Sequence, residues 1–128
     1  MDPISDIFVR IQNGYRARKA TVVLPYSRTK ERIAEVLAAR RFVNGVEKRG
    51  RKVRKFLEVE LRYDEGAAAL QGMRRLSKPS RHLYLGVRDI RPVRQGFGLL
   101  ILSTPLGIMA GEDARRAGVG GEAIAEVW

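Results

Sequence analysis

The residues best suited to contact another molecule lie in the loop Ser103-Thr104-Pro105-Leu106-Gly107. The Ser103 and Thr104 hydroxyls can donate and accept hydrogen bonds, so they can pair with a base edge or a ribose 2′-hydroxyl. Pro105 fixes its own φ and restricts Thr104, which stiffens the loop, and Gly107 permits close backbone approach. The same residues could form a plain turn whose hydroxyls bond to backbone groups, and taken alone they favour that simpler interpretation.

A second candidate is the turn Gly120-Gly121-Glu122. The glycines are not followed by Gly-Lys-Ser/Thr, which argues against a nucleotide-binding loop. We expect them to let the final turn pass close to the Ser-Thr loop or to RNA. We expect Glu122 mainly to orient the loop, because a carboxylate near phosphates is repelled. Its alternative role is to accept a hydrogen bond from a base amino group.

The remaining polar residues do not predict a catalytic centre or a metal site. His82 is the only histidine and the chain has no cysteine, so His82 is expected to be structural or simply exposed. Glu58 and Glu60 share a strand face and are expected to pair with cations on the neighbouring strand. The sequence therefore predicts a protein that is not an enzyme, with no cofactor, no metal and no small-molecule substrate.

The charge of the chain predicts a polyanionic partner. Its 128 residues contain 25 Lys and Arg against 14 Asp and Glu, a net charge of +11. No apolar run approaches the ~20 residues needed to span a bilayer, so a membrane partner is not expected. The N-terminus MDPISDIF does not resemble a signal peptide, which together with the absence of cysteine fits a cytoplasmic protein.

The positive charge is concentrated in the first half. Residues 1–64 hold 16 Lys and Arg against 8 Asp and Glu, whereas residues 65–128 hold 9 against 6. From Gln95 onward the balance is negative, with 2 basic and 4 acidic residues. The first half is therefore expected to attract phosphates, and contacts near the C-terminus to act by shape and hydrogen bonding.

Within the first half, the basic turn Lys48-Arg49-Gly50-Arg51-Lys52 is the strongest candidate for phosphate contact. A charge run is often only a solvated loop, and this alternative stays open. The net charge of the chain favours phosphate contact through Arg49 and Arg51. We expect Ser27, Arg28 and Lys30 to assist.

The apolar spacing predicts the elements that position these groups. A first helix is capped by Asp2-Pro3 and has one apolar face, interrupted at Asn13-Gly14. A second helix follows a cap at Ser27. Strands are predicted at residues 21–24, from Phe42, at 53–63, 73–76, 82–87, 99–102 and 123–128, and a short helix at 112–117.

This order predicts an α+β fold of two small lobes. The N-terminal lobe, residues 1–64, is a helix-strand-helix-strand-strand unit. The C-terminal lobe, residues 65–128, is mostly β with a short helix, and residues 64–72 are expected to be a linker. Tyr84, on a strand of the second lobe, is expected to be a core residue rather than a stacking platform.

The motifs resemble the bacterial small-subunit ribosomal protein eight family over nearly the whole chain. The matching segments are Asp2-Pro3-Ile4-Ser5-Asp6 with Arg10, Ile11 and Asn13, Pro25-Tyr26-Ser27 with Lys30, the series Ser77, Pro79, Arg81 and Tyr84, and Gly118-Val119-Gly120-Gly121-Glu122. The family loop is usually Ser-Thr-Ser-Lys-Gly, so Pro105 and Leu106 depart from it. Ser80 and Arg41 stand where the family usually has glycine; a left-handed Arg41 would cost about 1 kcal/mol.

The resemblance implies a structural protein of the small ribosomal subunit that binds the central domain of 16S rRNA and assists its assembly. It assigns recognition of an irregular RNA helix to the Ser-Thr loop. It makes Ser103, Thr104, Pro105, Gly107, Gly120, Gly121, Glu122, Arg81 and Tyr84 candidate RNA contacts. Neighbouring ribosomal proteins and the protein's own mRNA, whose translation it would repress, are further implied partners. A cytoplasmic ribosome is expected, and an organellar one is compatible. The alternative function is a free-standing basic RNA-binding regulator.

Overall fold

The computed structural model describes residues 2–128 and divides them into two compact units, one ending at Leu70 and the other running from Gln71 to Trp128. The first unit therefore extends past Asp64, where the sequence predicts its end. The segment expected to be a linker contains a small hairpin of β4 (Tyr63–Asp64) and β5 (Ala67–Ala68). Buried Leu70 also belongs to this unit.

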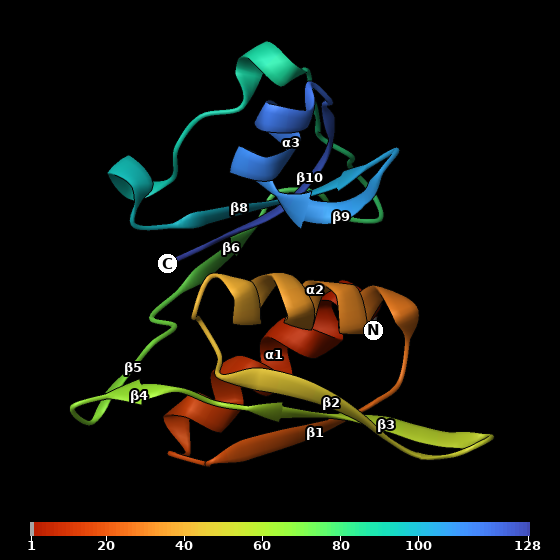
Figure 1. Ribbon diagram of the computed structural model, residues 1–128, viewed down its shortest axis with the longest axis vertical. Coiled ribbons are helices and arrows are strands. Elements are labelled where there is room, and N and C mark those ends of the chain that lie inside the picture. Colours follow the sequence, from red (N-terminus) through yellow and green to blue (C-terminus); the bar gives the residue numbers. More distant parts are fainter. Residues whose placement is uncertain (1) are drawn as a thin grey trace. The chain divides into compact units, whose positions relative to one another are not determined.

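The first unit places two helices on one face of a three-stranded antiparallel sheet (Figure 1). Helix α1 (Pro3–Arg16) is capped by the Asp2 side chain, which accepts a hydrogen bond from the Ser5 amide. The helix continues through Asn13-Gly14, because Gly14 is buried on the same face as the apolar residues. Its buried positions are Ile7, Phe8, Ile11, Gly14 and Tyr15.

The sheet of the first unit has the order β1-β3-β2, and β1 is Thr21–Pro25. Helix α2 (Arg28–Ala39) lies between β1 and β2 in the sequence and is capped by Ser27. β2 (Gly45–Arg51) and β3 (Arg54–Glu60) form a long hairpin. β2 begins three residues later than predicted, because Arg41 adopts a left-handed φ of 67° and residues 42–44 form bends.

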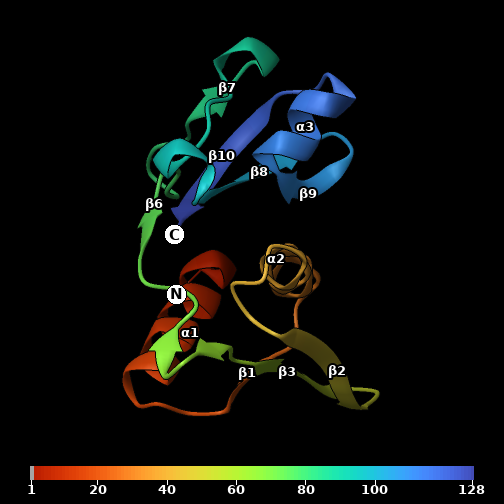
Figure 2. The same cartoon turned by 60° about the vertical axis from the view of Figure 1, so that its left-hand side comes forward.

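The second unit is a mostly β structure built around β10 (Gly121–Val127). β8 (Leu99–Thr104) pairs with one edge of β10, while β6 (Met73–Arg75) and β7 (Tyr84–Leu85) pair with successive parts of its other edge (Figure 2). β9 (Gly107–Ala110) completes the sheet beyond β8. Helix α3 (Gly111–Ala117) packs on this sheet over a core of Ile90, Val93, Leu100, Leu102, Ala114 and Ala123.

The α+β class predicted from the sequence is confirmed, with local corrections. The strand predicted at residues 82–87 is only two residues long, because Val87–Asp89 forms a 3-10 turn. A second 3-10 turn spans Arg94–Gly96. β9 was not predicted, since its four residues continue directly from the Ser-Thr loop and into α3. None of the described helices is long and apolar enough to cross a membrane.

Candidate nucleic-acid interface

The predicted Ser-Thr loop is a tight hairpin. Thr104 pairs with Gly107, so Pro105 and Leu106 alone form the turn between β8 and β9. The Thr104 hydroxyl donates to the Gly107 carbonyl at 2.8 Å and accepts from the Leu106 amide at 3.1 Å. This hydroxyl therefore orders the turn, as the simpler interpretation of the loop required. Within residues 2–128, the hydroxyl of its neighbour Ser103 has no hydrogen-bond partner and is available to another molecule.

The strand register places four residues in one row across the sheet. Ser103 on β8 pairs with Ile108 on β9 and with Glu122 on β10, and Glu122 pairs with Tyr84 on β7. Paired residues of antiparallel strands project from the same face, so Ser103, Glu122 and Tyr84 present a hydroxyl, a carboxylate and a phenol side by side. We call Ser103, Glu122 and Tyr84 the polar row.

The two glycines before Glu122 make this register possible. A Cβ on Gly121 would lie 2.2 Å from the Ser103 carbonyl oxygen, and one on Gly120 would lie 2.3 Å from that of Leu85. These distances leave no room for a Cβ atom, so only glycine fits at positions 120 and 121. The prediction that the glycines let the final turn pass close to the Ser-Thr loop is confirmed for Gly121, whereas Gly120 instead lies close to the backbone of Leu85 and Gly86.

Tyr84 and His82 lie at the β7 end of the polar row. The prediction that Tyr84 is a core residue was wrong: it is 71% exposed, because β7 is a two-residue strand at the sheet edge. Its ring lies near-parallel to that of His82, with the centroids 6.4 Å apart. Nδ1 of His82 contacts Oε2 of Glu122, which gives the lone histidine a partner that the sequence did not reveal.

Arg81 lies in the turn that leads to β7. Its amide and carbonyl pair with those of Lys78 at 3.0 and 2.8 Å, closing the turn. The side chain is exposed, and no ion pair to it is found in residues 2–128. Arg81 is thus available to a phosphate near the polar row.

Of the residues predicted at the start of α2, the structure leaves one cation available. The Ser27 hydroxyl accepts from the Lys30 amide at 3.1 Å as the helix cap. The Lys30 ammonium is buried and donates to Asp6 at 2.6 Å and to the Pro25 carbonyl at 3.1 Å. Hydrogen bonds from Lys30, and then from Arg10, lower the pKa of Asp6 and outweigh the opposing effect of burial. The geometry therefore assigns Ser27 and Lys30 structural roles, and only Arg28 is exposed.

Residues 48–51 of the predicted basic turn belong to β2, so the turn is shorter than predicted. We call residues 48–54 the basic hairpin; in the described part of the chain, some of its cations are ion-paired and others are not. Arg49 bonds to Glu47 and Glu58 at 2.8 Å each, as expected for Glu58. Arg51 lies directly opposite Arg54 in the register, and both are exposed. Like charges facing each other on a hairpin destabilise it, so this end of the hairpin is suited to an anion. Lys52 and Val53 form its turn.

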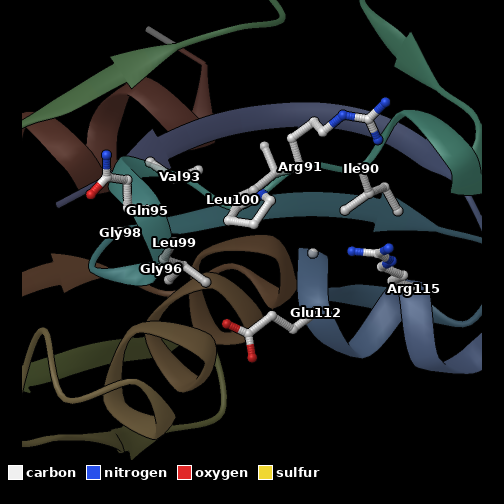
Figure 3. Close-up of a pocket in the computed structure, with 12 residues that line it drawn as sticks. Ile90, Arg91, Val93, Gln95, Gly96, Gly98, Leu99, Leu100, Glu112 and Arg115 are labelled. Carbon is white, nitrogen blue, oxygen red and sulfur yellow. The ribbon is translucent and has the colours of Figure 1, made fainter.

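The second unit also contains a cavity of about 310 Å³ (Figure 3). Ile90, Val93 and Leu100 line it, and Glu112 and Arg115 extend toward it from α3. Among the residues that the structure describes, its lining includes no serine, histidine or cysteine and none of the predicted site residues. No group of three or more potential metal ligands was found in residues 2–128. The cavity is thus separate from the polar row.

Comparison with known proteins identifies the family. The family described as Ribosomal protein S8 matches residues 2–128. The chain belongs to this family. Three relatives are each named small ribosomal subunit protein uS8. That of Dehalococcoides mccartyi is 42% identical over 128 residues, covering 99% of this chain and 98% of the relative. That of Rhizorhabdus wittichii is 41% identical over 127 residues, covering 99% and 97%. That of Thermus thermophilus is 40% identical over 135 residues, covering 99% and 98%.

Proposed function

We propose that this chain is a structural constituent of the small ribosomal subunit that binds ribosomal RNA directly. Membership of the S8 family and a net charge of +11 support this role, which requires no catalysis. The observation that carries the proposal is the polar row beside the Thr104 hairpin. Its three polar side chains lie on strands that are neighbours in the sheet, β7, β10 and β8, and the pairing of these strands fixes the distances between them.

Two surfaces have separate tasks in this proposal. The basic hairpin, with Arg51 and Arg54 opposed, provides attraction to phosphates that does not depend on sequence. Arg28 is exposed in the same unit and adds to it. The polar row and the Pro105-Leu106 turn discriminate by shape and hydrogen bonding, since irregular RNA helices expose base edges and 2′-hydroxyls to such groups.

The finer target follows from the family resemblance. We propose that the RNA is an irregular helix in the central domain of 16S rRNA, bound within a cytoplasmic ribosome beside other small-subunit proteins. A similar helix in the protein's own mRNA would allow it to repress its own translation. Pro105 and Leu106 replace a hydroxyl and a charge usual in the family, so this chain should depend more on Ser103 and on backbone groups for recognition.

Footprinting on purified 16S rRNA tests the proposal. The full chain should protect one compact set of nucleotides in the central domain at a protein concentration that leaves other domains unprotected. Protection spread over all domains would contradict a fixed ribosomal site and support the free-standing regulator instead. A matching footprint on the protein's own mRNA, absent from an unrelated mRNA, would support self-repression.

A further inference from the structure

His82 contacts Glu122 at the edge of the polar row. The imidazole lies just before β7 and is 51% exposed, whereas the Glu122 carboxylate on β10 is 25% exposed. The contact joins Nδ1 to Oε2. Within residues 2–128 no other side chain bonds to Glu122, so Oε1 remains open to an outside donor.

A carboxylate is an unfavourable group to present to RNA unless something compensates its charge. The phosphates repel it, and an unrestrained side chain would turn away from them. An imidazole N–H that bonds to one carboxylate oxygen fixes the orientation of the other and offsets part of the repulsion by the phosphates. Glu122 could then accept a hydrogen bond from a nucleobase N–H.

We propose that His82 is a positioning residue, which holds Glu122 so that Oε1 accepts a hydrogen bond from a nucleobase N–H. This inference rests on the proposed function. It makes His82, a residue with no predicted role, a determinant of specificity. Glu122 thereby has a recognition role in addition to its place in the sheet.

Among the described residues, the His82 imidazole is the one side chain that bonds to Glu122. The imidazole faces Glu122 of β10 and the ring of Tyr84 on its own segment. The neighbouring strand β8 contributes Ser103, which carries no charge. The nearby cations Lys78 and Arg81 are exposed, and in the described part of the chain neither is ion-paired with Glu122. Removing the imidazole should therefore leave the carboxylate uncompensated.

The test compares two RNA probes: a 16S central-domain helix with its irregular region, and the same helix made fully Watson–Crick paired. His82→Ala should weaken binding to the irregular RNA about tenfold, the size expected for a hydrogen bond to a charged group, and leave binding to the paired RNA unchanged. His82→Arg should restore binding to within about twofold, because a guanidinium can also bond to the carboxylate. Lys78→Gln, the matched control, should weaken both complexes equally.

The decisive measurement repeats His82→Ala in a Glu122→Gln background, where it should have no further effect. An equal loss in both backgrounds, or undiminished discrimination by His82→Ala, would overturn the inference. If wild type bound both RNAs equally, the proposed function itself would fail. The thermal unfolding of each variant is measured as well. If His82→Ala is unfolded, the same comparison is made with His82→Phe, which keeps a planar ring but has no hydrogen-bond donor.

Discussion

Thr104 and Ser103 are adjacent in the chain but have different environments. The Thr104 hydroxyl has two backbone partners inside the hairpin, to Gly107 and Leu106. Ser103 has no side-chain hydrogen bond among the described residues and belongs to the polar row. Removing the Thr104 hydroxyl should therefore affect the stability of the fold, whereas removing the Ser103 hydroxyl should affect RNA binding alone.

Thr104→Val should lower both the free energy of unfolding and the specific RNA affinity by about 1 kcal/mol, because the hairpin loses its internal bonds. Ser103→Ala should lower only the specific affinity, by about 1 kcal/mol, since its bond forms in the complex. Urea unfolding and RNA titration measure the two quantities. If Thr104→Val weakened binding without changing stability, the hydroxyl would act on RNA directly and its structural assignment would be wrong.

Asp6 is predicted to make folding stability depend on pH. Its pKa in the folded protein is lowered by the bonds from Lys30 and Arg10, so its contribution is present above the pKa of the unfolded chain. That contribution is lost as the pH falls through the folded value. Asp6→Asn should cost about 2 kcal/mol at pH 7, because the buried Lys30 ammonium loses its counter-ion.

Urea unfolding across pH checks this expectation. The difference in free energy of unfolding between wild type and Asp6→Asn should begin to shrink below about pH 4, where Asp6 of the unfolded chain takes up its proton, and should continue to fall through the lower pKa of the folded protein. Glu35→Gln is the control, since Glu35 pairs with Arg32 at 3.7 Å with both side chains half exposed. It should change stability by less than about 0.5 kcal/mol. If the difference in free energy of unfolding between wild type and Asp6→Asn stayed constant down to about pH 2, the assigned ion pair would be contradicted.

At the scale of elements, the basic hairpin is predicted to set the salt dependence of RNA binding. Replacing Arg51 and Arg54 by Gln should reduce the slope of log affinity against log salt by roughly 2, because each arginine neutralises about one phosphate. Discrimination between RNAs should stay the same. Arg49→Gln is the matched control, and it should change the slope less because Arg49 already pairs with Glu47 and Glu58. Equal slopes for wild type and the double variant would mean that the hairpin does not touch RNA.

The loop after α2 should tolerate a stabilising change. Arg41 has a φ of 67°, in the region that favours glycine. Arg41→Gly should raise the free energy of unfolding by up to about 1 kcal/mol. Arg40, with a φ of −97°, offers the contrast, and Arg40→Gly should be destabilising. A decrease in the stability of Arg41→Gly would show that the Arg41 side chain makes compensating interactions.

The elements show which features a sequence can predict. Helix caps at Asp2 and Ser27 and the alternation at Leu57 and Val59 are local, and the structure contains them as expected. The exposure of Tyr84 could not be predicted, because it depends on which strand lies at the sheet edge. The contact of His82 with Glu122 joins residues forty positions apart through sheet pairing, which a single sequence does not reveal.

At the scale of the molecule, the proposed function divides attraction and discrimination between different parts of the chain. Residues 1–64 carry twice as many basic as acidic residues, whereas the chain from Gln95 onward has a negative balance. Attraction by phosphate contacts falls with salt, but hydrogen bonding to base edges depends on salt much less. The two contributions can therefore be separated in one experiment on the intact protein.

That experiment measures the affinity of the full chain for the irregular 16S helix and for its fully paired version, from low to high salt. Both affinities should fall with salt at similar slopes, because both RNAs offer phosphates to the basic hairpin. The ratio of the two affinities should stay well above one and nearly constant, because the polar row sets it. A ratio that is one at every salt concentration, or that falls to one as salt rises, would contradict the account.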